Sequence, residues 1–488
     1  MADLKRKSVR GGATTLAAQA ITIAIQLAST VVLARLLSPG DYGVMAMVMA
    51  VTGFAALFRD LGLASAAIQK KDLSRAQQSN LFWLNVAMGA VLTGLVAAAA
   101  PLVAWLYGKP ELTSLTVALS LSFLVGSLGT QAGAMLVRDM KFARQAIANI
   151  SGAIAGLAVS ITLASQGYSY WALAWGSLFG GMVATLLLFR LSAFRPGLWT
   201  RGAGIRDMLT FGATVTAFDI VNYFHRNLDH VLIGRFWGAE ALGLYSRAYS
   251  LLMLPIGSIR GPINAVAFPA MSKLQQEPEA YRTYYRRITA IVAFLSMPLC
   301  AYLFVTSRPI IELALGQQWL GVVPIFSVLA ISSFIQPVAS LRGLVMLSTA
   351  RGKDYLTWGV FNAVTVSVGF VCGLPWGAMG IAISYAIANY AILYPSLVLA
   401  FKGTPLRKRD FFQPLARPAF ASLVGVAAAL LIKRHMGSHA AIQSLGISTI
   451  AFAVPYLAAF AIAPGGVREL KTHTELWRQF RSQRKGNP

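Results

Sequence analysis

The sequence predicts an all-α polytopic membrane protein with about fourteen membrane-spanning helices, built as two related six-helix lobes followed by two extra helices. Three observations predict this class. Of 488 residues, 56% are hydrophobic and 12% are charged, and the mean hydropathy is +0.62, whereas soluble domains average roughly 25% charged residues. Apolar stretches of roughly 20 residues, the length that crosses a bilayer, follow one another almost from end to end. Lysine and arginine also gather in alternate loops.

Fourteen apolar segments are expected to span the membrane, with short polar loops between them. Glycine and proline inside several of them are tolerated, because neighbouring helices can satisfy the freed backbone groups. The least distinct boundaries are the tight turns at residues 166–169 and 373–377. The expected spans cover residues 13–34, 42–66, 81–107, 112–136, 146–166, 170–189, 208–234, 242–272, 288–305, 319–347, 356–372, 378–400, 414–432 and 442–463.

The loops predict the orientation of the chain. Of the 42 lysines and arginines, 31 lie in the two termini and one alternating set of loops, 6 lie in the other set, and 5 lie inside spans. By the positive-inside rule, the side rich in positive charge is cytoplasmic, together with both termini. The net charge of +25 does not indicate nucleic-acid binding, because the basic residues are spread over many short loops. Anionic lipid headgroups are the expected partners.

The chain repeats itself weakly at an offset of 200 residues. Seven residues between positions 12 and 43 recur 200 positions later without a gap: Gly12, Ala13, Thr14, Ala17, Val31, Arg35 and Gly43. Six spans separate the two copies, so both halves have the same orientation, as in transporters with parallel repeats. The expected domains are lobes at 1–207 and 208–401, an extra helix pair at 402–463 and a basic tail at 464–488.

Five arginines lie inside predicted spans, where a charge is costly and usually faces a partner or a wet cavity. Arginine carries a planar fork of donors that suits phosphate. We therefore expect a track for an anionic headgroup, although salt bridges to other helices or snorkelling at the membrane boundary would also explain such residues. The five are Arg59, Arg226, Arg247, Arg260 and Arg342, with Arg35 and Arg235 at the outer helix ends.

Acidic residues inside the spans have two readings. Asp219, Arg226 and Asp229 share one helix face with Asn222, because they recur every three or four residues. We expect this face to line a cavity. Asp60, Asp219 and Asp229, with His225 as a titratable neighbour, either pair with arginines or couple transport to an ion. Arg247, Arg260 and Arg342 have no acid within one helical turn.

No segment carries a phosphate-binding loop of ATPases or the spacing of a metal site, so we expect no cofactor, no metal and no catalytic residues. The longest outer loop, about thirteen residues at 306–318, holds no catalytic constellation. The chain is therefore expected not to be an enzyme.

Four segments carry a family resemblance: LARLLSPGDYG at 33–43, FRDLGL at 58–63, GLYSRAY at 243–249 and FPAMS at 268–272. They resemble the Wzx-type polysaccharide flippases, in the exopolysaccharide and colanic-acid branch of the multidrug/oligosaccharidyl-lipid/polysaccharide exporter superfamily. The resemblance covers most of the chain and is strongest over residues 10–275. It implies two lobes with alternating access across the bacterial inner membrane.

The same resemblance implies that the cargo is an undecaprenyl-diphosphate-linked oligosaccharide, used for exopolysaccharide or lipopolysaccharide synthesis. It also implies a cation-lined cavity, and polysaccharide polymerase and chain-length proteins as partners. By analogy with lipid II flippases, the two extra spans could hold the prenyl tail. The alternatives are a multidrug exporter, a lipid II flippase, and a membrane polymerase or ligase.

Overall fold

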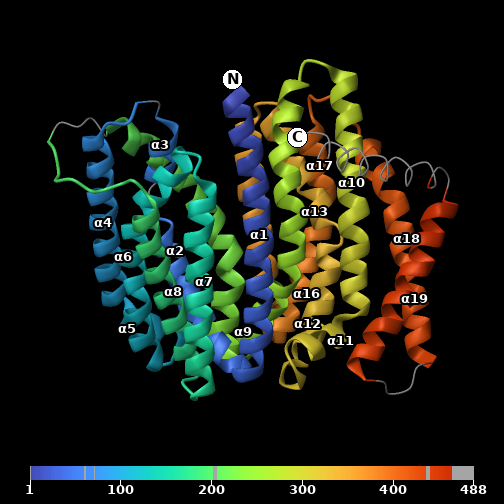
Figure 1. The fold of residues 1–488 in the computed structure, drawn as a ribbon. Helices are drawn as coiled ribbons and strands as arrows, with labels where there is room; N and C mark the ends of the chain where they lie inside the picture. Colours follow the sequence, from blue (N-terminus) through green and yellow to red (C-terminus); the bar gives the residue numbers. More distant parts are fainter. Residues whose placement is uncertain are drawn as a thin grey trace. The chain divides into compact units, whose positions relative to one another are not determined.

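The computed structural model describes the backbone of residues 2–59, 62–70, 72–201, 206–435, 440–463 and 466, and the same side chains except those of residues 2–13, 16 and 206–226. Throughout this part of the chain the structure is helical and contains no strand. The chain divides into two compact units, residues 1–246 and 247–488. Figure 1 shows the helices of each unit running side by side.

The first unit contains eight helices and the beginning of a ninth among its described residues. They are α1 (Ala2–Leu36), α2 (Pro39–Ala56), α3 (Leu63–Gln69), α4 (Arg75–Ala98), α5 (Ala100–Tyr107), α6 (Glu111–Arg138), α7 (Phe142–Ser165), α8 (Tyr170–Leu191) and α9 (Arg206–Lys273), which continues into the second unit. Its closest helix pairs are α7 with α8 and α4 with α6.

The second unit begins inside α9 and ends with two long helices, α18 and α19, that pack together. Its elements are α10 (Pro278–Val305), α11 (Ser307–Ala314), η1 (Gln317–Trp319), α12 (Val322–Ser333), α13 (Gln336–Ala339), α14 (Leu341–Ser348), α15 (Gly352–Gly373), η2 (Leu374–Trp376), α16 (Gly377–Ala391), α17 (Leu393–Phe401), α18 (Lys408–His435) and α19 (Ala441–Ile462). The outer loop predicted at 306–318 thus folds as the short helix α11 and the turn η1.

Local sequence signals explain several helix ends. Ser38 and Asp41 form a capping box at the start of α2, with Pro39 in the first turn, and Ser74 and Gln77 form another at the start of α4. Each box satisfies backbone N–H groups that the first turn leaves without a partner. The predicted turn at 166–169 separates α7 from α8, and η2 lies at the predicted turn of 373–377.

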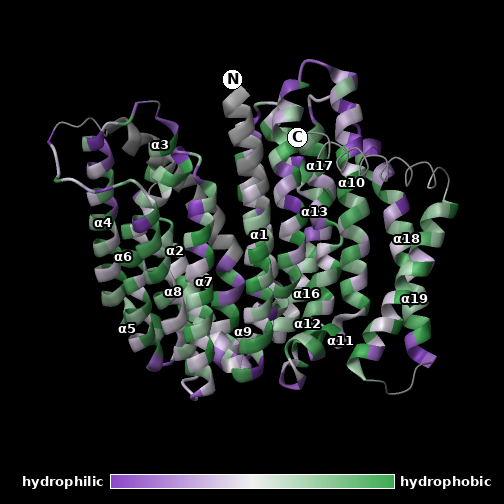
Figure 2. Cartoon of the chain, viewed as in Figure 1, coloured by the Kyte–Doolittle hydropathy of each residue, from purple (hydrophilic) through white to green (hydrophobic). Residues whose placement is uncertain are grey.

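Eleven helical stretches of the described chain are long and apolar enough to cross a membrane. Two of them, Asn227–Lys273 with 47 residues and Gly352–Phe401 with 50, are long enough for two crossings each. The first is interrupted at Gly238, whose φ of 82° lies in the region that glycine adopts readily. Figure 2 shows hydrophobic residues along most of the helices and hydrophilic ones near many of their ends. The multi-pass fold is confirmed, while the count of fourteen spans stays a prediction.

A reciprocal contact joins α2 to the part of α9 that follows Gly238. A β-carbon on Gly43 would clash with the Ala239 carbonyl oxygen, and one on Gly243 would clash with the Pro39 carbonyl oxygen. Positions 39 and 43 correspond to 239 and 243 at the predicted offset of 200. Reciprocal pairing of corresponding residues is the signature of a two-fold axis, so this contact agrees with the predicted repeat.

Each unit also uses a basic residue to cap the end of a neighbouring helix. In the first unit, Arg144 Nη1 donates to the Leu191 carbonyl oxygen at the end of α8 (3.2 Å). In the second, Arg351 donates to the carbonyl oxygens of Leu399, Ala400 and Lys402 around the end of α17 (2.8, 2.9 and 2.6 Å). Both arginines lie at the start of the fifth predicted span of their lobe and cap the sixth.

Candidate functional site

Two of the predicted arginines come together in the second unit. Arg342 lies on α14 and Arg260 on α9, and their guanidinium groups are near enough to interact electrostatically. Arg342 is half-buried, whereas Arg260 is exposed. Like charges that face each other repel, and the repulsion strengthens as water is excluded. An anion placed near both groups would remove this cost.

Among the described residues, the surroundings of Arg342 supply an aromatic ring and a hydroxyl. Its guanidinium lies 4.9 Å from the ring centre of Trp358 on α15, in a cation–π contact. Tyr285 on α10 interacts electrostatically with Arg342 and is fully buried, with Thr289 one helical turn away as the neighbour of its hydroxyl. Within the described chain Arg342 forms no ion pair. Two cations and a hydroxyl donor together suit an anionic group.

Arg59 belongs to the first unit and lies against α6. A β-carbon on Gly126 would lie 2.7 Å from Arg59 Nη1, so only a glycine allows the guanidinium to approach this closely. Its Nε is buried and forms no hydrogen bond with any described residue. The anion-binding role of Arg59 stays a prediction.

Three other described arginines of the predicted track, Arg247, Arg35 and Arg235, do not distinguish between binding and snorkelling. Arg247 is half-buried on α9. Arg35 and Arg235 are exposed at the predicted outer helix ends, and Arg235 lies over the ring of its neighbour Phe236 at 5.9 Å. Exposure at a helix end fits the snorkelling alternative as well as a binding role.

Among the predicted acids, Asp229 is described and is buried. Its carboxylate accepts a hydrogen bond from the Tyr245 hydroxyl (2.8 Å) and one from the backbone N–H of His230 (2.9 Å). Since Tyr245 follows the interruption at Gly238, this bond ties together the two halves of α9. Asp60 and the side chains of Asp219, His225 and Arg226 lie outside the described residues, so their predicted roles stay predictions.

One buried ionic cluster was not predicted from the sequence. Asp410 at the start of α18 is 1% exposed and pairs with Arg282 on α10, whose Nε lies 2.8 Å from its carboxylate, with Arg286 Nε at 3.8 Å. It also accepts from the backbone N–H of Arg407 (2.8 Å). The cluster joins the extra helix pair to α10. No sequence signal reveals it, because Asp410 and Arg282 are 128 residues apart.

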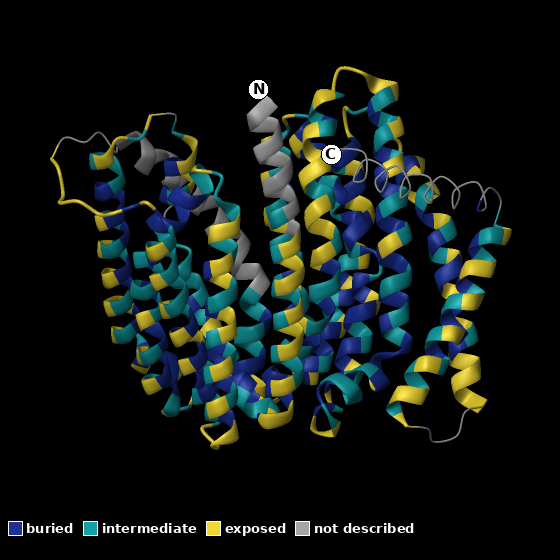
Figure 3. Cartoon of the chain, viewed as in Figure 1, coloured by how far each residue is buried: buried dark blue, intermediate teal, exposed yellow. Residues whose placement is uncertain are grey.

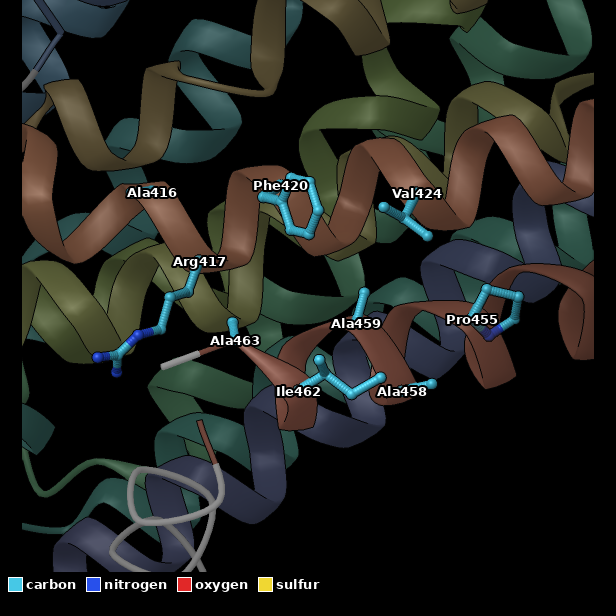
Figure 4. Close-up of a pocket in the computed structure, with 9 residues that line it drawn as sticks. All are labelled: Ala416, Arg417, Phe420, Val424, Pro455, Ala458, Ala459, Ile462 and Ala463. Atoms are coloured by element: carbon cyan, nitrogen blue, oxygen red, sulfur yellow. The ribbon is translucent and has the colours of Figure 1, made fainter. Parts of the chain in front are cut away.

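An apolar groove of about 710 Å³ runs between α18 and α19. Figure 4 shows Phe420 and Val424 on one side and Pro455, Ala459 and Ile462 on the other. Arg417, near one end, is the charged residue of the lining. The groove has the form expected for a chain-like apolar ligand with a charge at one end.

Comparison with known proteins gives the family. The profile of the family described as "Polysaccharide biosynthesis protein" matches residues 32–324. The lipopolysaccharide biosynthesis protein WzxC of Escherichia coli (strain K12) is 27% identical over 431 residues, which cover 86% of each chain. The teichuronic acid biosynthesis protein TuaB of Bacillus subtilis (strain 168) is 29% identical over 475 residues, covering 92% of this chain and 95% of TuaB. The succinoglycan biosynthesis transport protein ExoT of Rhizobium meliloti (strain 1021) is 25% identical, with 86% and 85% covered.

Solved structures confirm the transporter fold. The lipid II flippase MurJ, in an inward-closed conformation, superimposes with a TM-score of 0.76 at 15% identity, covering 93% of this chain and 98% of MurJ. An inward-facing multidrug-resistance transporter of the MATE family, in the MOP superfamily, gives 0.62 at 15% identity, covering 78% and 95%. At these identities the likeness concerns the fold alone.

Proposed function

The chain belongs to the polysaccharide biosynthesis protein family, and from this premise we propose that it flips undecaprenyl-diphosphate-linked oligosaccharides across the bacterial inner membrane by alternating access. Both termini would be cytoplasmic, as the distribution of basic residues predicts. The cargo would serve exopolysaccharide or lipopolysaccharide synthesis, together with a polymerase and chain-length proteins. The names of the relatives, which concern lipopolysaccharide, teichuronic acid and succinoglycan, support this choice.

The observation that carries the proposal is Arg342, a half-buried arginine whose guanidinium lies over the Trp358 ring and forms no ion pair with any described residue. A cationic drug would be repelled by this charge and by the nearby charge of Arg260, whereas a diphosphate would be attracted and would accept two-pronged hydrogen bonds. Tyr285 would add a hydroxyl donor, and the Trp358 ring offers the kind of apolar face on which a sugar ring can pack. These arginines therefore support an anionic headgroup over the cationic cargo of a multidrug exporter.

The polyprenyl tail and the later stages of transport also have candidate contact residues. The polyprenyl tail would lie in the apolar groove between α18 and α19, where burial of hydrocarbon supplies roughly 0.8 kcal/mol per CH₂ relative to water. In the first unit, Arg59 would contact the headgroup at another stage of transport through its unused Nε. Asp229 would contribute to ion coupling, with Tyr245 as its hydrogen-bond donor.

Transport of a labelled undecaprenyl-diphosphate-linked oligosaccharide in proteoliposomes tests this function. We expect Arg342→Ala and Arg260→Ala to lower the flipping rate at least tenfold, and Arg342→Lys to restore part of it, because lysine keeps the charge and loses the planar fork. Arg308→Ala, at an exposed position of α11, is the matched control and should transport normally. Normal flipping by both alanine variants, or wild-type efflux of a cationic dye without oligosaccharide flipping, would contradict the proposal.

A further inference from the structure

The segment between α8 and α9 is held firmly against α4, and two apolar residues project from it. Trp83 Nε1 donates to the Gly197 carbonyl oxygen (2.8 Å), and the Gly197 N–H donates to Ser79 Oγ (2.9 Å). Three residues later, Thr200 exchanges two hydrogen bonds with the Asn80 amide, at 2.9 Å and 2.7 Å. The backbone is thus fixed on both sides of Leu198 and Trp199.

The sequence of the segment suits this attachment. Phe194 is buried in the core beneath it and packs near the ring of Phe82 on α4, with 5.8 Å between ring centres. A β-carbon on Gly197 would lie 3.2 Å from Ser79 Oγ, so glycine allows a close approach of the segment to the helix. Ser79 and Asn80 are themselves buried. These contacts hold the backbone of the segment on α4, whereas the side chains of Leu198 and Trp199 are not packed in the core.

Leu198 is 87% exposed and Trp199 is 50% exposed. In Figure 3 the segment is drawn mostly as exposed, beside the beginning of α4. Single exposed apolar residues are common in proteins. Leu198 and Trp199 differ because they are adjacent and their backbone is fixed by hydrogen bonds on both sides. The segment therefore cannot rearrange to bury their side chains. Three exposed arginines, Arg190, Arg195 and Arg201, lie within nine residues of the pair.

We propose that the Leu198–Trp199 pair is an interfacial anchor that inserts into the headgroup–acyl boundary of a leaflet containing anionic phospholipid. The attachment points Ser79, Asn80 and Trp83 lie in the first turns of α4, where the apolar span begins and where the membrane surface is expected. Tryptophan is enriched at this depth because its ring is amphipathic. Arg190 and Arg201 add attraction to anionic headgroups, which acts on basic residues close to the surface. In the orientation proposed above, this leaflet is the cytoplasmic one.

A spin label placed at residue 198 tests the anchor in the full chain, in bilayers of phosphatidylcholine with phosphatidylglycerol. The background carries Cys372→Ser, because Cys372 is exposed and Cys300 is buried. We expect collisions of the Leu198→Cys label with dissolved oxygen to exceed those with a water-soluble nickel chelate at least threefold. A label at Arg308→Cys, exposed on α11, is the control and should favour the nickel chelate.

Two further measurements distinguish a pair inserted in lipid from a pair that lies in water or against protein. Asn80→Ala removes one attachment and should increase the mobility of the label at residue 198 while reducing its depth. Pure phosphatidylcholine, or Arg201→Ala, should also reduce the depth. A label at residue 198 that meets the nickel chelate as often as the control would place the pair in water. A label shielded from both reagents would place the pair against protein, and either result would overturn the proposal.

Discussion

The reciprocal contact of Gly43 and Gly243 leads to a quantitative prediction about close packing. In Gly43→Ala, the new β-carbon would lie 2.8 Å from the Ala239 α-carbon and closer still to the carbonyl carbon and the carbonyl oxygen of that residue. Non-bonded carbons pack at roughly 3.5–4.0 Å, so α2 and α9 must part by more than about 1 Å. Overpacking of this kind costs about 1–3 kcal/mol, which exceeds the roughly 1 kcal/mol that alanine gains over glycine in a helix.

Gly257 on α9 is the matched control, because a β-carbon there would meet nothing within 4 Å. Thermal unfolding of the purified protein in detergent should show a lower Tm for Gly43→Ala and Gly243→Ala, and an unchanged or higher Tm for Gly257→Ala. Since one displacement of α2 relieves both clashes, the double variant should lose less than the sum of the single losses. If Gly43→Ala and Gly243→Ala were as stable as Gly257→Ala, the close reciprocal packing would be wrong.

Three other predictions concern buried polar groups. Asn85 and Gln131 are fully buried one turn from the Gly89–Ser127 contact of α4 with α6, and their amides have no hydrogen bond among the described residues. Leucine at either position should therefore raise the free energy of unfolding by about 1–3 kcal/mol, because it removes a buried polar group that has no partner in the described chain. A lower Tm for each single variant would show that the two amides support each other. Asp410→Ala should lower the Tm by more than alanine at the exposed Asp139, because the removal leaves Arg282 without its buried partner. Arg351→Ala should speed amide exchange at the end of α17, and protection equal to that of wild type would contradict its role as a cap.

Much of the fold could be predicted because it depends on local signals. Length and apolarity place helices along most of the predicted spans, although the predicted spans 42–66 and 319–347 are each divided into shorter helices. The polar interruption at 166–169 is a turn between α7 and α8. Residue 238 interrupts α9, because a single glycine with a φ of 82° and a ψ of −177° redirects the chain between two helical halves, and periodicity could not show that one residue would be enough for this turn. The division between spans 7 and 8 was nevertheless expected at that point, between residues 234 and 242.

The sequence indicates which residue types could form the candidate site, but it does not indicate which side chains from other helices contact them. Arg342 can be selected from the sequence alone, because a charged side chain inside a membrane span costs free energy. Its contact with the Trp358 ring could not be predicted, because Trp358 lies on another helix. Asp229 was expected to pair with an arginine or to couple transport to an ion, and the structure adds Tyr245, 16 residues away, as a hydrogen-bond donor. Such partners depend on how helices pack, which spacing along one helix does not reveal.

The reciprocal glycine contact also bears on how the protein arose. A repeat whose corresponding residues touch each other reproduces, within one chain, the interface of a symmetric homodimer. A half-length ancestor with the same glycine could have met a second copy of itself through this surface, since six spans would insert both copies with the same orientation. Fusion of two such genes would convert a concentration-dependent association into a permanent one, and would free each copy of the glycine-bearing helix to change independently.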